Sequence, residues 1–290
     1  MKILQTIPVL MMMVFLFSCG KEQSVEKKVQ EPVDSTDIPG SGSLLIRQVS
    51  RGDGAADSTV ITFSYDAQKR ITKMKTSQEG MGNQIYANEE LRFYRNSDGV
   101  VERFVDHVTY YNAGLDPDSV VYIVQHNDQG KFTYAIRTLY SSNWNDSRDS
   151  LVYGYNDKGL ISLFQAFSLG DDDNYFESHR SQYIYDARNN VTEFTILFRD
   201  DANSTDPAQV FHFEYDDKVS TVNFGNDSCI PGLYLTGLAS SSNMVKLQEI
   251  GGENQSFTYN YTYNSNNQPV MAIVNDLLNN TTSTVKYYYQ

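Results

Sequence analysis

Cysteine is scarce in this chain, and basic residues are fewer than acidic ones. Its 290 residues include only two cysteines, Cys19 and Cys229, and 23 Lys and Arg against 36 Asp and Glu. Cys19 ends an apolar leader, and if it is consumed there Cys229 has no partner for an internal disulfide. The formal net charge is −13 and no basic cluster occurs. We therefore expect no nucleic-acid partner, because binding to phosphates depends on clustered Lys and Arg.

The sequence signatures of common catalytic sites are missing as well. No Gly-x-Ser-x-Gly elbow, phosphate-binding glycine loop or His-Glu-x-x-His motif occurs. The histidines are spread over different parts of the chain, and none pairs with another at the spacing of metal ligands: His107, His126, His179 and His212. We expect no metal centre, no cofactor and no enzymatic activity.

The chain also lacks an apolar run long enough to cross a bilayer as a helix, which takes ~20 residues. The run at Ile7–Phe17 is shorter; it follows Lys2 and precedes Ser18 and Cys19, which is typical of a secretory signal at residues 1–18. Its ending, Leu-Phe-Ser-Cys, resembles the bacterial lipobox, with Phe17 replacing the usual small residue. This resemblance implies that Cys19 is diacylated and becomes the mature N-terminus. The alternative is an ordinary cleaved signal with an incidental cysteine.

Residues 19–43 are polar, charged and low in aromatic residues, and they end in Pro39-Gly40-Ser41-Gly42-Ser43. Such a composition buries too little apolar surface to fold. We interpret this segment as a disordered tether between the lipid and a domain at residues 44–290. The charged start at Lys21–Gln23 weakly resembles the export signals of Bacteroidetes surface lipoproteins. The expected location is the cell envelope, at the outer membrane, on its periplasmic face or at the cell surface.

From Leu44 onward the chain repeats with a period near 30 residues. Each unit begins with an alternating apolar strand, such as Ile61-x-Phe63-x-Tyr65, that ends in an aromatic residue. The tyrosines at this position, with His126 in the third place, are Tyr65, Tyr94, Tyr155, Tyr185, Tyr215, Tyr263 and Tyr289. A period of this size indicates a repeat architecture.

A polar turn rich in Asp, Asn and Gly follows each of these strands, for example Asn156–Gly159, and indicates a hairpin. Apolar residues in the second strand are three apart, as in Ile71 and Met74. Either a β-bulge or partial cover of both faces explains this spacing. We predict an all-β fold: an antiparallel meander of about 14–16 strands, forming a curved sheet or a barrel, with short turns at one end and long loops at the other.

One segment, at residues 223–255, departs from the repeat. It contains Pro231, several glycines, a serine run and apolar residues that need burial, such as Leu233 and Leu247. We interpret it as an insertion that caps one end of the sheet or barrel, or that carries a specific function.

Two families share parts of this pattern. The turns at Tyr65–Ile71 and Tyr155–Ile161 resemble the YD repeats of Rhs-type bacterial surface proteins, which implies hairpins. The lipobox, the tether, the serial hairpins, the segment at Ile230–Ile250 and the last hairpin at Tyr259–Val274 resemble DUF4595, a family of Bacteroidetes lipoproteins of unknown function. That resemblance implies a porin-like fold and an envelope location, and it supplies no catalytic residue.

A porin-like shape does not by itself imply a pore. A membrane-spanning barrel needs an apolar outer band and strands of ~9–11 residues. The strands expected here have about seven to nine residues, and no second face is consistently apolar. We therefore expect the barrel to stand outside the bilayer.

Acidic residues gather in the expected long loops. The densest cluster is Asp171, Asp172 and Asp173, with Glu177 close by. Further acidic residues are assigned to other long loops: Asp116, Asp118, Asp146, Asp149, Asp200, Asp201 and Asp206. Because these loops share one end of the fold, we expect an acidic rim there. Calcium prefers such oxygen ligands. No ordered ligand spacing occurs, so a solvated loop tip is the simpler interpretation.

Aromatic residues are the other ligand candidates, because their faces can stack on sugars. Weak candidates in the loops and the insertion are Trp144, Tyr175 and Tyr234. The tyrosines that alternate along strands are first of all expected in the core.

Together these observations favour a membrane-anchored envelope lipoprotein with a non-enzymatic binding or structural role, and with a glycan or an envelope protein as its partner. The alternatives are a glycan-processing hydrolase that uses loop carboxylates and a docking subunit of an envelope complex.

Overall fold

The computed structural model of the chain describes residues 44–53, 58–79, 86–111, 117–141, 147–170, 174–199, 209–220, 240–251 and 254–290. These residues form sixteen β-strands and no helix. The strands are β1 (Leu45–Gly52), β2 (Ser58–Tyr65), β3 (Ile71–Glu79), β4 (Tyr86–Arg95), β5 (Val101–Tyr111), β6 (Asp118–His126), β7 (Phe132–Tyr140), β8 (Ser147–Tyr155), β9 (Ile161–Leu169), β10 (Tyr175–Tyr185), β11 (Val191–Phe198), β12 (Gln209–Val219), β13 (Ser242–Ile250), β14 (Ser256–Tyr263), β15 (Pro269–Asp276) and β16 (Thr281–Tyr289).

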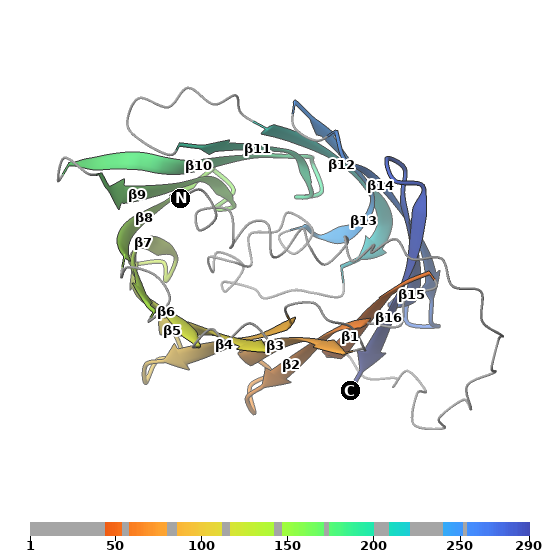
Figure 1. Cartoon of the computed structure of the whole chain (residues 1–290), viewed down its shortest axis with the longest axis horizontal. Coiled ribbons are helices and arrows are strands. Elements are labelled where there is room, and N and C mark those ends of the chain that lie inside the picture. Colours follow the sequence, from red (N-terminus) through yellow and green to blue (C-terminus); the bar gives the residue numbers. More distant parts are fainter. Residues whose placement is uncertain are drawn as a thin grey trace.

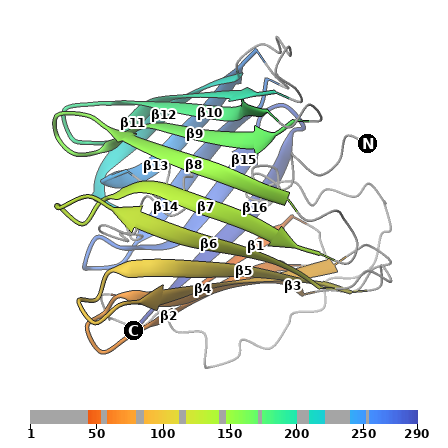
Figure 2. The same ribbon diagram turned by 90° about the vertical axis from the view of Figure 1, so that its left-hand side faces the viewer.

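Every strand pairs with its neighbours in sequence, and β1 pairs with β16 to close the sheet into a barrel. All pairings are antiparallel, so the predicted meander is confirmed and its closure is established. Figure 1 shows the ring end-on, elongated in cross-section, and Figure 2 shows the strands running obliquely across its wall. The two ends of the barrel chain meet, because Leu44 and Gln290 exchange backbone hydrogen bonds of 3.1 and 2.9 Å.

The predicted turns form for a local reason that recurs in six hairpins. In the first, the Asp66 Oδ1 atom accepts hydrogen bonds of 2.9 Å from the backbone N–H groups of Gln68 and Arg70. Asn96, Asn127, Asn156, Asp186 and Asn264 accept the corresponding pairs in the later turns. The residue three places further on takes a positive φ, as Gly130 does at 73°. An Asx side chain and a left-handed residue together define this turn.

A β-bulge explains the three-residue spacing in the second strands. Tyr65 pairs with Ile71, but Ser64 pairs with Lys73, so Thr72 is the extra residue and Met74 returns to the face of Ile71. The same shift occurs after the turns that precede β5, β7, β9, β11 and β15. The bulge was one of the two alternatives that the sequence left open, and each one adds local twist to the wall.

The apolar side chains of the strands share one face of the sheet. Phe104, Phe211 and Phe257 are 0–1% exposed, and they belong to one continuous cluster to which nearly every strand contributes. In a closed barrel the covered face is the interior, and residues alternate between interior and exterior along each strand. The registers of the strand pairs then assign each remaining residue to the inner or outer face.

Two sequence predictions need correction. The strands have 8–11 residues rather than seven to nine. β5 continues into Asp106–Pro117 and β10 begins within Ser168–Ser178, two segments that we expected to be loops because of their polar residues. Tyr94 does not occupy the repeated tyrosine position: it faces outward opposite Arg103, and Arg95 takes the inner place opposite Val101.

Part of the predicted insertion is a regular strand. β13 lies within residues 223–255 and pairs along its length with β12, and near its C-terminal end with β14. Leu247 is 9% exposed and belongs to the core, as expected for an inward strand residue. Residues 221–239 lie outside the described part of the chain, so the proposed cap remains a prediction.

Candidate functional site

Most of the ligand candidates from the sequence lie outside the described residues. These are Trp144, Tyr234 and Asp171, Asp172 and Asp173, and the lipidation candidate Cys19 lies outside them as well. Tyr175 is described: it begins β10, pairs with Leu169 and is 56% exposed. Of the other acidic loop candidates, five lie outside the described residues: Asp116, Asp146, Asp200, Asp201 and Asp206. The remaining two, Asp118 and Asp149, are not on loop tips, because they lie in β6 and β8 and are each 5% exposed. Their prediction as part of an acidic rim was wrong.

The repeated tyrosines are structural ties between successive hairpins. The hydroxyl of Tyr185, at the end of β10, donates a 2.7 Å hydrogen bond to the carbonyl oxygen of Ile161, the first residue of β9. Tyr65, Tyr155 and Tyr289 make the corresponding bonds to Leu45, Phe132 and Pro269. Arg95 replaces tyrosine in its unit and donates to the Ile71 carbonyl at 3.0 Å. These hydroxyls are therefore already used within the fold and are poor candidates for ligand binding.

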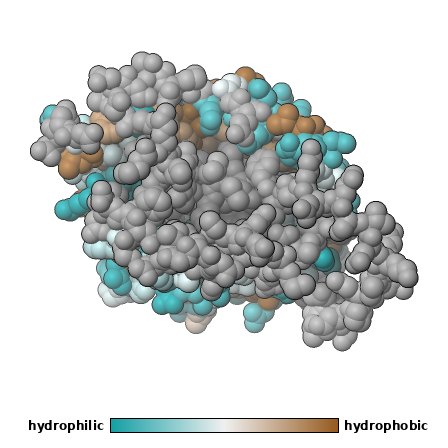
Figure 3. Space-filling model, in the orientation of Figure 1, coloured by the Kyte–Doolittle hydropathy of each residue, from teal (hydrophilic) through white to brown (hydrophobic). Residues whose placement is uncertain are grey.

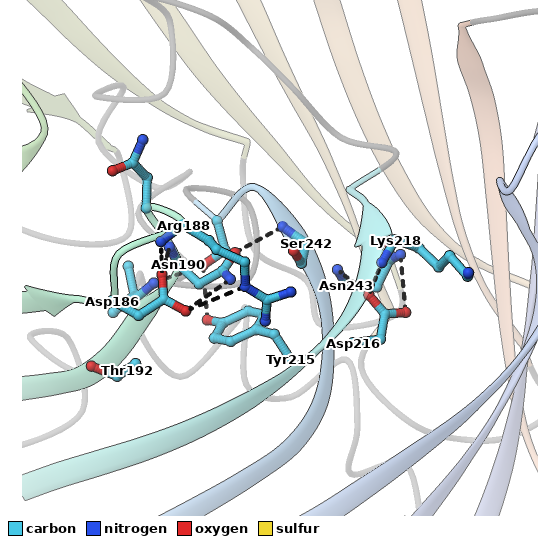
Figure 4. Close-up of polar contacts among 12 residues, drawn as sticks. Asp186, Arg188, Asn190, Thr192, Tyr215, Asp216, Lys218, Ser242 and Asn243 are labelled. Atoms are coloured by element: carbon cyan, nitrogen blue, oxygen red, sulfur yellow. Dashed lines mark hydrogen bonds and ion pairs between the residues drawn. The ribbon is translucent and has the colours of Figure 1, made fainter.

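A second set of ties joins the turn after β10 to the segment that leads into β13 (Figure 4). The fully buried Asn190 donates through Nδ2 to Asp186 Oδ2 at 3.1 Å, and its Oδ1 accepts from the Ser242 backbone N–H at 2.8 Å. Ser240 Oγ accepts from the Val191 N–H at 3.1 Å and lies 2.8 Å from the Tyr215 hydroxyl. Because every group here has a partner, this region holds the chain before β13 in place.

A carboxyl pair lies on the inner face of β4 and β5. Glu89 and Asp106 are hydrogen-bonded side chains of adjacent strands, and Thr76 lies directly opposite Glu89 on β3. Burial, the charge of Glu89 and the hydrogen bond to it raise the pKa of Asp106 well above its usual value. Burial also raises the pKa of Glu89, although the hydrogen bond from Asp106 opposes that shift. These shifts favour a proton shared by the pair, with Asp106 as the donor.

Further charged and polar groups continue this band around the inner wall. Arg137 on β7 lies 2.7 Å from Asp149 Oδ2 on β8, and Asp149 Oδ1 accepts a 2.8 Å hydrogen bond from Ser168 on β9. Ser168 in turn contacts Ser178 at 2.7 Å. His179 packs edge-on against Phe164, and burial together with Arg137 lowers its pKa to about 4. The imidazole is therefore neutral near pH 7.

We name this inner polar band by its members: Thr76, Glu89, Asp106, Arg137, Asp149, Ser168, Ser178 and His179. Chemically it can exchange a proton at the carboxyl pair and offer hydrogen bonds to a polar group inside the barrel. The buried Oδ1 of Asp106 and Oγ1 of Thr76 have no hydrogen-bond partner among the described residues. Within that same part of the chain, no three His, Cys, Asp or Glu side chains are placed to hold a metal ion.

The sequence analysis missed this band. Its residues come from five consecutive hairpins, so no short motif brings them together. A usable signal was present, however: Asp106, Arg137 and Asp149 occupy strand positions that alternate with outward residues and where other hairpins carry an apolar residue. Charged residues at inward positions of a predicted barrel indicate contacts across the strands.

The sequence matches no protein-family model and no curated protein. Solved structures with a similar fold include a porin-like protein from Bacteroides uniformis ATCC 8492, with a TM-score of 0.53 and 12% identity over 87% of this chain and 99% of that one. A porin-like protein from Bacteroides vulgatus ATCC 8482 has a TM-score of 0.50 and 14% identity over 85% and 98% of the two chains. At these identities the likeness establishes the fold alone, and it agrees with the porin-like barrel that the family resemblance implied.

Proposed function

We propose that the protein is a lipid-anchored component of the bacterial cell envelope, held at the outer membrane through Cys19, whose barrel is a non-enzymatic binding or structural module. The barrel does not span the bilayer in this proposal. The two porin-like neighbours from Bacteroides support an envelope role through their fold and source. The leader and the polar tether support the anchor.

One observation carries the proposal: charged side chains face outward on most of the strands, while the side chains that face inward are mainly apolar. Lys73 and Lys75 face outward on β3, Glu193 on β11, Glu214 on β12 and Lys246 on β13, as their strand registers show. Figure 3 shows mostly hydrophilic described residues around the edge of the end-on view, with separate hydrophobic patches. A Lys facing lipid at the bilayer midplane costs about 2–4 kcal/mol. Several such residues around the circumference therefore oppose complete insertion.

Within the described ranges, no helix is long and apolar enough to cross a membrane. An anchor at Cys19 would attach to the barrel at Leu44, next to the C-terminal Gln290. Residues 20–43 between them span at most about 80 Å when fully extended, so the barrel would remain close to the bilayer.

Substitution of the acylated residue tests the anchor. Cys19→Ala should abolish incorporation of radiolabelled palmitate and release the chain from the membrane fraction, because the lipid then has no cysteine to which it can be attached. Cys229→Ala is the matched control and should stay labelled and membrane-bound. Palmitate label that persists in Cys19→Ala would refute lipidation at this residue.

Cutting the tether tests whether the barrel spans. A specific protease site placed at Gly40–Ser43 of the full chain would be cleaved in isolated membranes, which would then be washed at alkaline pH to remove peripheral contacts. A barrel outside the bilayer should move to the supernatant. A cleaved barrel that stays in the pellet after the wash would show insertion and overturn the proposal.

A glycan is the ligand class that we propose to test first, because two exposed aromatic residues lie near the long-loop end. Tyr140 is 53% exposed and Tyr175 is 56% exposed. The hydrolase alternative has lost two of its loop carboxylates, since Asp118 and Asp149 are buried strand residues. A glycan array with the full chain should show binding that Tyr175→Ala weakens and that Tyr288→Ala, near the opposite end, leaves unchanged. No binding to any glycan would exclude this ligand class.

A further inference from the structure

Four neighbouring strands, β6–β9, differ from most of the barrel in having almost no charged residue on the outer face, although their inner face belongs to the apolar core like that of the other strands. Their charged residues face inward, as Asp118, Arg137 and Asp149 do. The one charged residue that faces outward on these strands, among the described residues, is Arg148 at the start of β8. An outer face that is nearly free of charge is what a barrel wall needs in order to contact lipid.

The outward apolar residues of these strands lie on one outer surface, interspersed with uncharged polar residues such as Ser150 and Gln165, and we call this surface the apolar wall: Val121, Ile123, Ile136, Val152, Leu163 and Phe167. Ile123 pairs with Ile136, which pairs with Ser150, which pairs with Phe167, so a single cross-strand row runs over four strands. Ile123 is 50% exposed, and Leu169, further along β9, is 52% exposed. Figure 2 looks directly onto these strands, which lie side by side in the middle of the view. An exposed patch that gathers several apolar side chains indicates an interaction surface.

The strands on either side of the apolar wall bound it with charge. Arg103 on β5 ends the row at one side, opposite Ile123, and Glu177 on β10 ends it at the other, opposite Phe167. Arg148 and Arg180 also lie outward near its edges. Arginines beside an apolar surface can reach lipid headgroups while the surface itself contacts acyl chains.

The shape of the barrel helps to decide what covers this surface. In Figure 1 the strands β6–β9 form one convex end of the elongated ring. Two convex walls meet only along a narrow strip, whereas a stable protein interface needs about 800 Å² from each partner. A bilayer is deformable and can follow a convex surface. A tethered domain also meets its own membrane at a high effective concentration.

We infer that the apolar wall of β6–β9 lies against the membrane, so that one side of the barrel rests in the headgroup and upper acyl region while the charged remainder stays in water. This inference rests on the proposed lipid anchor, which supplies the membrane. The inner polar band behind β6–β9 is then shielded from lipid by the wall itself. An amphipathic surface of this kind sits about 5–10 Å deep, far less than a spanning barrel.

A tryptophan probe in the full acylated chain tests this orientation. In a Trp144→Phe background, Ile123→Trp places a probe on the apolar wall, and Asn260→Trp places one on the outward face of β14. Both chains would be reconstituted into phosphatidylcholine vesicles with and without brominated acyl chains. Brominated lipid should reduce the fluorescence of Ile123→Trp at least twofold and leave that of Asn260→Trp unchanged. Ile136→Trp serves as a second probe on the wall if Ile123→Trp folds poorly.

Flotation of the same vesicles separates the two proposals. Chains that float with the vesicles but show no quenching at Ile123 would overturn the membrane contact and leave the anchor intact. A blue-shifted but unquenched probe would mean that protein, such as a second copy of the chain, covers the wall, and this also overturns the inference. Chains that fail to float would overturn both the anchor and the contact.

Discussion

At the residue scale, the high tyrosine content has a structural explanation. A tyrosine at the end of a strand places its ring in the core and its hydroxyl beside the preceding hairpin. Tyr65, Tyr155 and Tyr185 each use that hydroxyl on a backbone carbonyl oxygen. Burial raises the pKa of Tyr65 to about 12, which keeps this donor protonated at any physiological pH. Phenylalanine could fill the same space but could not make the tie.

Removing one hydroxyl should therefore weaken the barrel. Tyr185→Phe loses the 2.7 Å bond to the Ile161 carbonyl, and we expect the free energy of unfolding to fall by about 1 kcal/mol. Denaturant titration measures the change. Tyr140→Phe, at a 53% exposed position, is the control and should be silent. Equal stability of Tyr185→Phe and the parent chain would mean that the ties contribute geometry only.

The carboxyl pair predicts a dependence of stability on pH. The folded state raises the pKa of Asp106 above its unfolded value. The protonated carboxyl therefore contributes fully to the free energy of unfolding below the unfolded pKa. This contribution is lost as the pH rises through the folded pKa, by about 1.4 kcal/mol per pH unit in that window. Asp106→Asn keeps a hydrogen-bond donor for Glu89 and removes this loss. The free energy of unfolding of the variant should therefore rise relative to that of the parent as the pH increases above the ordinary Asp pKa of about 4.

The comparison between variant and parent at each pH isolates this effect. His179, whose pKa is lowered to about 4 in the folded state, titrates in both chains. Its contribution to the free energy of unfolding therefore cancels in the difference between them. Gln182→Asn, at an outward position of β10 that carries no ionisable group, is the control and should show a flat difference. A flat difference for Asp106→Asn as well would contradict the shared proton.

At the scale of the element, the hairpin is the unit that the sequence specifies. The alternating strand, the Asx turn and the following bulge recur with only local variations. The position with positive φ is Gly in three turns, Lys69 in the first, Asn189 in the fifth and Asn267 in the last. Side chains at these positions are conformationally strained, whereas glycine is not.

Two opposite substitutions test this local strain. Gly130→Ala should destabilise the protein by about 1 kcal/mol through backbone strain alone, because an added Cβ at Gly130 meets nothing within 4 Å. Lys69→Gly, at the same place in the first turn, should be neutral or stabilising by up to about 1 kcal/mol. Thermal unfolding of both variants would show whether each one is less or more stable than the parent chain. A stabilising Gly130→Ala would refute the left-handed requirement.

The sequence predicted the hairpins well because their signals are local. Turn residues, alternation and period lie within one unit, so the strand count and the all-β class followed from them. Tyr94 was nevertheless assigned to the repeated position, although the apolar residues Leu91 and Phe93 of its strand alternate with it and already place Arg95 on their own face. The end of β5 and the start of β10 were also missed, because polar residues such as Asp106 and Ser178 suggest a loop until the opposite strands supply their partners.

The inner polar band and the apolar wall of β6–β9 were not predictable for a different reason. Both depend on which residues face each other across strands from different hairpins, and a one-residue change in register would exchange the two faces. The bulges set that register. The sequence allowed either a bulge or two covered faces, so inward and outward positions in the second strands stayed ambiguous until the pairing was known.

At the scale of the whole molecule, closure depends on the two ends of the chain. β1 pairs with β16 from Leu45↔Tyr289 to Gly52↔Ser283, so the seam forms only after the last strand has been made. Contacts this distant in sequence slow folding, because the loop that they close must be ordered first. Partly made barrels would expose the unpaired edges of β1 and β15.

Deletion of the last strand should therefore have a large effect. A chain that ends at Asp276 loses β16 and leaves two open edges, and we expect loss of cooperative unfolding together with aggregation. Hydrogen exchange should show β1 amides that are no longer protected. Substitution of Thr284, an outward residue of β16, by Ser is the control and should leave protection intact. A truncated chain with a protected β1 would show that the seam is dispensable.

The paired ends have a consequence for how the molecule can be re-engineered. Leu44 and Gln290 are already joined by two backbone hydrogen bonds, so a short linker between them would turn the domain into a continuous ring of hairpins. New termini could then be opened in any of the tight turns, for example between Gln129 and Gly130. We expect such circular permutants to build the same barrel while moving the tether to a chosen hairpin, which would rotate the barrel relative to the membrane without changing its wall.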